Sequence, residues 1–217
     1  MRLRIAFFFL ALLSLAYAAE DKLTITGYFI TFNDEDMPDG LKTGQEREAA
    51  LKRKAGSDET IGRIVQDDKN GYLALGFKTR QQSVRHEYAV WRLPGDTPVL
   101  GMNSLYSGAG GITGTVRFVK FVKSGVGFVW QDANEEVFAD FKQSTFQPKP
   151  NAPAGCKDEP PLAQFPENFS CKLPQKGLTV VCQFNLNCDT PTKLTPKDFY
   201  AKPVVKFEWK KDRFVAK

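Results

Sequence analysis

The chain has 217 residues, 42% of them hydrophobic, and its 30 Lys and Arg residues outnumber 25 Asp and Glu residues to give a formal net charge of +5. A chain of this size buries roughly 70% of its unfolded surface, so it holds a hydrophobic core without help. After the N-terminus no window approaches about 18 uninterrupted apolar residues, which argues against a later membrane-spanning helix. The excess of basic residues lies in the last part of the chain, and the body before it is about neutral.

The N-terminal residues have the pattern of a signal peptide. Arg2 and Arg4 precede a short apolar run, and Ala16-Tyr17-Ala18 matches the small-x-small pattern of a cleavage site. We therefore expect residues 1–18 to be removed, the mature protein to be secreted or periplasmic, and no transmembrane span to remain. An uncleaved N-terminal anchor is the alternative.

The next segments predict one strand and one short helix. Residues 23–32, LTITGYFITF, are dense in β-branched and aromatic residues, which favours a strand. After an acidic turn at 33–40, residues 45–54 are rich in helix-forming residues, with Glu48 four residues before Lys52. We expect a short exposed helix there.

From residue 61 the pattern becomes strands separated by turns. The strands are IGRIVQ, YLALGF, EYAVWRL and PVLGMN, with turn sequences KNG and PGD between them. In TVRFVKFVKSGVGFVWQD, a turn at Ser124-Gly125 places Val119 opposite Trp130 and Phe121 opposite Phe128, which predicts a hairpin with one apolar face.

A proline-rich stretch divides the chain. Six prolines fall between residues 147 and 166, a composition that favours an extended connector. We therefore predict a β-rich domain at 19–147, a connector at 148–166 and a C-terminal disulfide-linked β subdomain at 167–217. In the last segment, Val205, Phe207 and Trp209 alternate with charged residues, as in a half-buried strand followed by a short final one.

All four cysteines lie in the C-terminal third of the chain, and an even number in an exported protein predicts two disulfides. A turn at 176–177 places Cys171 opposite Cys182, about 4.5 Å apart at Cα, which is within reach of a disulfide. Cys156 is then left for Cys188, one of three pairings. Pro174 requires an edge strand at that point. The spacing lacks the CxxC pairs of a zinc site.

The glycine-rich stretch SGAGGITG, residues 107–114, resembles a phosphate-binding loop only superficially. In a dinucleotide fingerprint the sixth position is glycine and a helix follows, whereas here that position is Thr113 and a strand pattern follows. No Gly-Lys-Ser/Thr follows either. We predict a surface loop between strands and no nucleotide ligand.

The acidic turn at 33–40 suggests calcium. An EF-hand is excluded, because its fifth position from Asp34 is Pro38 and its twelfth is Gln45. A looser calcium site at Asp34, Asp36 and Asp39 is an alternative to a solvated polar turn. We expect no other cofactor.

The sequence contains no recognisable catalytic motif. His86 is the only histidine, no Gly-x-Ser-x-Gly motif is present, and oxidised cysteines offer no thiolate. The sequence therefore favours a non-enzymatic protein and assigns no catalytic residue.

The basic C-terminal segment is a candidate surface for polyanions, because clustered positive charge attracts them. The candidate residues are Lys206, Lys210, Lys211 and Arg213. The competing interpretation is that these side chains form the solvent face of an ordinary strand. Asn168 begins an Asn-Phe-Ser glycosylation sequon, and the three tryptophans are predicted to lie in the core.

Three short segments, KNGYL, AVWRLPGDTPVLGMN and VKFEWKKDRFV, resemble recurring pieces of uncharacterised exported β-rich bacterial proteins. That resemblance implies an envelope or secreted location and no activity. We expect a mainly β protein with antiparallel sheets, as a sandwich or an open barrel-like structure, one short helix and a disulfide-bearing C-terminal part. The expected function is binding to a protein or an anionic polymer of the envelope. The alternative is a polysaccharide hydrolase that uses Asp/Glu carboxylates.

Overall fold

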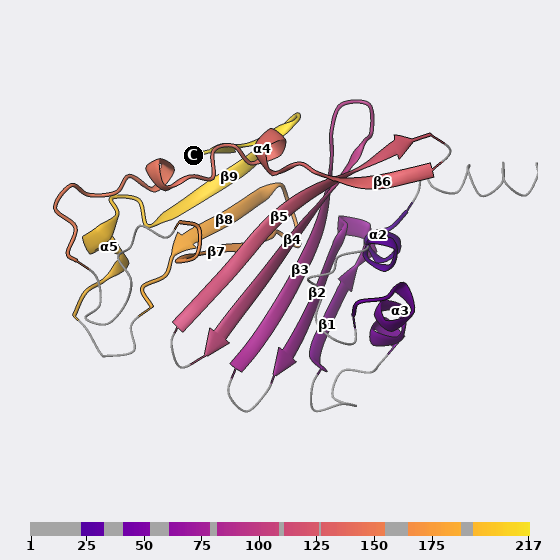
Figure 1. Ribbon diagram of the computed structural model, residues 1–217, viewed down its shortest axis with the longest axis horizontal. Coiled ribbons are helices and arrows are strands. Elements are labelled where there is room, and N and C mark those ends of the chain that lie inside the picture. Colours follow the sequence, from indigo (N-terminus) through magenta and orange to yellow (C-terminus); the bar gives the residue numbers. More distant parts are fainter. Residues whose placement is uncertain are drawn as a thin grey trace, which may run out of the picture.

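The computed structural model describes residues 23–32, 41–52, 61–78, 82–108, 111–125, 127–154, 165–187 and 193–217. They form two antiparallel sheets, one of six strands and one of four, with two helices on the side of the six-stranded sheet that faces away from the four-stranded one (Figure 1). The mainly β fold class is thereby confirmed. The signal peptide prediction, 1–18, lies outside the described residues.

The six-stranded sheet is a meander in which each strand pairs with the next along the chain. The strands predicted between residues 61 and 132 are all present in it. Gly71 and Gly95, both at positive φ, lie in the turns where the sequence places them. The strands are β1 (Ile61–Asp67), β2 (Tyr72–Lys78), β3 (Gln82–Arg92), β4 (Pro98–Gly108), β5 (Gly111–Ser124) and β6 (Gly127–Asp132).

The four-stranded sheet has the order β10-β9-β8-β7. Cys171 pairs with Cys182 across β7 and β8, their Cα atoms are 4.0 Å apart, and they form a disulfide, as predicted. β7 is an edge strand, as predicted, but it ends at Lys172, so Pro174 follows the strand instead of lying inside it. Cys156 and Cys188 lie outside the described residues. The strands are β7 (Phe169–Lys172), β8 (Thr179–Phe184), β9 (Val204–Lys210) and β10 (Arg213–Ala216).

The strand predicted at residues 23–32 is wrong, because Ile25–Thr31 form helix α2. The hydroxyl of Thr24 caps this helix by accepting a hydrogen bond from the backbone N–H of Gly27. The composition is typical of a strand, but the apolar side chains recur every three or four residues, and only a helix puts them on one buried face. These buried residues are Ile25, Tyr28, Phe29 and Phe32.

The predicted short helix is present as α3 (Gly44–Lys52), and Lys52 forms an ion pair with Glu48 at 2.6 Å. Three further short helices are present in the described residues after β6. They are α4 (Asn134–Val137), the 3-10 helix η3 (Gln143–Phe146) and α5 (Pro196–Phe199), while the 3-10 helix η2 (Asp68–Asn70) joins β1 to β2.

The β5–β6 hairpin forms where predicted, but its register differs by two residues. Phe121 lies opposite Trp130, and Val119 lies opposite Asp132, whereas the prediction paired Phe121 with Phe128 and Val119 with Trp130. The loop begins one residue later than expected because a glycine at positive φ, not the serine before it, opens it. A shift of two residues keeps each side chain on its predicted face.

Two apolar cores lie on opposite faces of the six-stranded sheet. The helix-facing core joins α2 and α3 to one face, and the inter-sheet core joins the other face to the four-stranded sheet. Trp91 and Trp209 are buried in the inter-sheet core, and Trp130 packs against the helix-facing core, so all three tryptophans lie where predicted. The residues on both sides of the predicted connector therefore share one core.

The inter-sheet core makes a testable prediction at β10. Phe214 is fully buried, and its ring centroid lies 5.0 Å from that of Trp91, 5.1 Å from Phe118 and 4.9 Å from Trp209. We expect Phe214→Ala to lower the free energy of unfolding by about 3–5 kcal/mol in urea titrations. Val215→Ala, on the exposed face of the same strand, is the control and is expected to change it by less than about 1 kcal/mol. Equal losses in the two variants would contradict the proposed packing.

Candidate functional site

The structure describes some of the predicted site residues and leaves others outside the described ranges. The calcium candidates Asp34, Asp36 and Asp39 lie outside the described residues. Within the described ranges, no group of three or more His, Cys, Asp or Glu side chains is arranged to hold a metal ion. None of the helices in these ranges has the length and the apolar composition needed to span a bilayer.

The predicted polyanion-binding residues come together at the β9–β10 hairpin, but acidic neighbours engage two of them. Lys210 lies 2.8 Å from a carboxylate oxygen of Glu208, and Arg213 lies 3.3 Å from Asp212. Hydrogen bonds from Lys210, and then from Lys217, hold the pKa of Glu208 below its usual value. Lys206 and Lys211 are also exposed here. Polyanion binding at this hairpin stays a prediction.

His86 is buried on the helix-facing side of β3, with 3% of its surface exposed. Its Nδ1 lies 2.8 Å from the hydroxyl oxygen of Ser104, and its ring packs edge-on against Phe77. Burial lowers the pKa of His86 from 6.5 to about 4, because a charged imidazolium is poorly solvated there. A neutral, enclosed imidazole has no route to a substrate, so this residue is structural.

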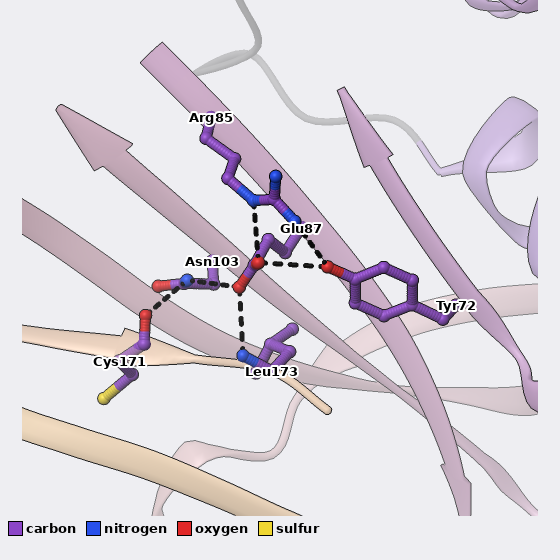
Figure 2. Close-up of polar contacts among 6 residues, drawn as sticks. All are labelled: Tyr72, Arg85, Glu87, Asn103, Cys171 and Leu173. Atoms are coloured by element: carbon purple, nitrogen blue, oxygen red, sulfur yellow. Dashed lines mark hydrogen bonds and ion pairs between the residues drawn. The ribbon is translucent and has the colours of Figure 1, made fainter. Parts of the chain in front are cut away.

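A buried polar cluster lies on the opposite face of β3, between the two sheets (Figure 2). The carboxylate of Glu87 is fully buried and accepts four hydrogen bonds. Its Oε1 accepts from the Tyr72 hydroxyl at 3.0 Å and from Arg85 Nε at 2.9 Å. Its Oε2 accepts from Asn103 Nδ2 and from the backbone N–H of Leu173, both at 3.0 Å. Each carboxylate oxygen thus accepts from two donors.

The residues that donate to Glu87 make further hydrogen bonds that fix their own side chains. Arg85 also donates from Nη2 to the Tyr72 hydroxyl at 3.0 Å, and Asn103 donates to the Cys171 carbonyl at 2.7 Å. Burial first, and then the nearby Glu87 charge, raise the pKa of Tyr72 to about 12, so its hydroxyl stays protonated. Burial lowers the pKa of Arg85, but its hydrogen bonds to Glu87 and Tyr72 outweigh this and leave the pKa raised.

Sequence reasoning missed this cluster, although one signal for it exists. Glu87 occupies the same strand face as Ala89 and Trp91, both of which are buried in the inter-sheet core. A charge on the core side of an apolar strand requires buried partners.

An open groove of about 830 Å³ lies at the end of the β4–β5 hairpin, where Gly111 and Ile112 form part of its lining. Three side-chain amides line it, those of Gln183, Asn185 and Asn187. Asn185 accepts from Gln183 Nε2 at 3.0 Å and donates to the Ser170 hydroxyl at 2.6 Å. Asn187 accepts from the backbone N–H of Ile112 at 3.1 Å. These bonds fix the orientation of all three amides.

Two amide groups in the groove have hydrogen-bonding capacity to spare. Asn187 Nδ2 and Gln183 Oε1 make no side-chain hydrogen bond within the described part of the chain. Exposed apolar side chains lie beside them, with Ile112 40% and Val204 51% exposed. The groove therefore offers a donor, an acceptor and apolar surface, which suits a ligand that has hydroxyl groups and C–H faces.

The glycine-rich stretch proves to shape this groove. The prediction of a surface loop is wrong for most of it, because β4 continues to Gly108 and β5 begins at Gly111. Gly111 has φ +111, and a side chain there would collide with the Asn187 amide. Glycine at this position lets the hairpin approach the segment that carries the groove amides.

The comparisons with known proteins do not assign a family. No family model matches the chain, and no curated protein matches it. A solved domain of an uncharacterised protein from Porphyromonas gingivalis W83 is similar, with 11% sequence identity and a TM-score of 0.41 over 83% of this chain and 93% of that chain. A likeness at this level carries no argument about function.

The buried carboxylate makes a second prediction. Glu87→Gln keeps the side-chain volume but turns one acceptor oxygen into a donor that faces other donors. We expect a loss of at least about 2 kcal/mol in the free energy of unfolding, measured by urea titration. The control is Glu136→Gln, which removes an exposed ion pair to Lys120 and is expected to cost at most about 1 kcal/mol. If Glu87→Gln costs no more than its control, the cluster does not hold the sheets together.

The depressed pKa of His86 makes a third prediction, on pH dependence. The folded protein keeps this imidazole neutral down to about pH 4, whereas the unfolded chain binds the proton below about pH 6.5. The free energy of unfolding should therefore fall as pH drops from 6.5 to 4, by at most about 1.4 kcal/mol per pH unit.

In His86→Gln this part of the pH dependence should disappear, and because the chain has a single histidine no other imidazole can replace it. Urea titrations of both proteins at several pH values measure the difference. Parallel pH profiles for the two proteins would show that His86 is not held neutral.

Proposed function

We propose that this chain is an exported, non-enzymatic binding protein of the cell envelope or extracellular space, and that a hydroxyl-bearing polymer binds in its amide-lined groove. The observation that carries the proposal is the composition of the groove. Its described lining contains three oriented amides and exposed apolar side chains, and Lys197 is its one ionisable residue. Amides bind ligand hydroxyls as donors and acceptors but do not transfer protons at neutral pH.

The alternative, a polysaccharide hydrolase, needs two carboxyl groups that face a ligand. The described residues that line the groove, and those that line two smaller cavities of about 380 and 270 Å³, include no Asp, Glu or His. Glu87 is enclosed between the sheets and has accepted four hydrogen bonds. These observations support binding over hydrolysis.

Export has separate support. The Cys171–Cys182 disulfide joins two strands of the core. Such bonds form and persist mainly in oxidising compartments, which favours a secreted or periplasmic location.

The binding proposal predicts a ligand-dependent gain in thermal stability. Dextran, as a neutral polymer, and polygalacturonate, as an acidic one, are the probes. A ligand at 100 times its dissociation constant stabilises the folded state by about 2.7 kcal/mol, which is visible as a raised Tm. We expect Gln183→Ala to reduce the shift, because it removes the acceptor oxygen in the groove and leaves Asn185 with one partner fewer.

Gln175→Ala is the control, since it makes the same change at an exposed position in the β7–β8 loop. It should leave the shift intact. The absence of a shift with both polymers, or equal shifts in the two variants, would contradict binding in the groove.

A further inference from the structure

A second cavity, of about 380 Å³, adjoins the amide-lined groove on the inner face of the six-stranded sheet. Ile112 lines both cavities. The strand register brings Arg63, Gly76 and Arg85 into one row across β1, β2 and β3, and Lys78 and Ser83 into the next row. We refer to the cavity that these residues line as the basic pocket.

The described lining of the basic pocket contains three cations and no acidic residue, and of the three Arg85 is paired with the buried Glu87 behind it. Arg63 and Lys78 make no ion pair or side-chain hydrogen bond within the described ranges, and both are exposed. The hydroxyls of Ser83 and Ser107 line the same cavity and are neutral hydrogen-bond donors. This donor set is complementary to an anion.

Arg85 is held in place before any ligand arrives. Its Nε and Nη2 are bonded to Glu87 and Tyr72, as Figure 2 shows, so the guanidinium cannot rotate freely. The side chain is still 40% exposed, and its Nη1 makes no hydrogen bond to a described residue. A guanidinium fixed on two sides by buried partners loses little conformational entropy when it binds an anion.

Gly76 keeps the space between Arg63 and Arg85 open. The φ of this glycine is not positive, and a Cβ there would meet its nearest neighbour, the Arg63 carbonyl oxygen, at 3.5 Å, which is an ordinary contact. Backbone geometry and packing therefore do not require glycine at this position. A larger side chain at this position would instead fill the basic pocket between Arg63 and Arg85.

We propose that the basic pocket binds a carboxylate or sulfate group of an acidic polysaccharide whose neighbouring sugar hydroxyls occupy the amide-lined groove. The inference rests on the proposed function, because it names the class of polymer for that groove. Arg85 and Arg63 contact the anionic group from opposite sides of Gly76, and Lys78 adds a third charge. The continuous surface through Ile112 lets one chain occupy both cavities.

The test compares two double variants that lose the same amount of charge. Arg63→Ala/Lys78→Ala removes two cations from the basic pocket and spares Arg85, on which the buried cluster depends. Lys206→Ala/Lys211→Ala removes two exposed cations from the β9–β10 hairpin. Isothermal titration measures the affinity for polygalacturonate, which has carboxylates, for dextran sulfate, and for neutral dextran, and thermal unfolding verifies that each variant is folded.

We expect the pocket double variant to weaken binding of at least one acidic polymer by about tenfold or more, with dextran unaffected. The hairpin double variant should lower the affinity for the acidic polymers by less than about threefold, because it loses only non-specific charge attraction. Gly76→Val, which fills the pocket without changing its charge, should also weaken binding. The two acidic polymers distinguish a carboxylate ligand from a sulfate ligand.

Equal losses in the two double variants would overturn the basic pocket as a site, and so would full binding by Gly76→Val. If dextran and the acidic polymers bind equally well and independently of Arg63 and Lys78, the basic pocket is wrong while groove binding stands. If none of the polymers binds, the proposed function itself fails. Polyglutamate that binds as tightly, with the same dependence on the variants, would replace the polysaccharide with an acidic peptide.

Discussion

The fully buried Glu87 carboxylate is the interaction on which the arrangement of the two sheets depends. It lies on the six-stranded sheet, yet one of its four hydrogen-bond donors is the backbone N–H of Leu173, directly after β7. Asn103 extends the connection by donating to the carbonyl of Cys171. A buried charge is tolerated only when it is fully hydrogen-bonded, so this cluster permits one position of the four-stranded sheet, whereas apolar contacts alone would permit many. Apolar packing supplies the stability, and the polar cluster supplies the orientation.

Much of the fold follows from local patterns in the sequence. Alternation of apolar and charged residues located β9, and the turn sequences KNG and PGD located the turns at Gly71 and Gly95. The register set by a two-residue turn at 176–177 located the Cys171–Cys182 pair. Residues 25–31 show where this reasoning stops, because their β-branched composition predicted a strand, whereas the spacing of their apolar side chains is that of the helix they form. Spacing prevailed, since it determines which side chains reach the helix-facing core, whereas intrinsic preference differs by only about 1 kcal/mol.

The candidate site was less accessible to sequence reasoning. Clustered lysines at the C-terminus drew attention to the β9–β10 hairpin, where Glu208 and Asp212 engage Lys210 and Arg213. The cations of the basic pocket lie far apart along the chain, and only strand register places Arg63 near Arg85. The groove amides are equally inconspicuous, because neutral side chains leave no charge pattern. The orientation of Asn187 also depends on the backbone of a different hairpin.

The meander topology has a consequence for the order in which the protein assembles. Each strand of the six-stranded sheet pairs with its neighbour in sequence, so residues 61–132 form their backbone hydrogen bonds through short loops, which is kinetically favourable. The inner face of that sheet, however, is covered by later parts of the chain, first by residues 133–146, with Phe138 packed on Phe118, and then by the strands after residue 165. If the chain folds from its N-terminus, the first sheet is therefore a partly folded intermediate in which an aromatic face and the Glu87 carboxylate are exposed. Packing of the C-terminal strands against this face completes the fold. The export proposed above would keep the chain unfolded until translocation and would thereby avoid that exposed intermediate in the cytoplasm.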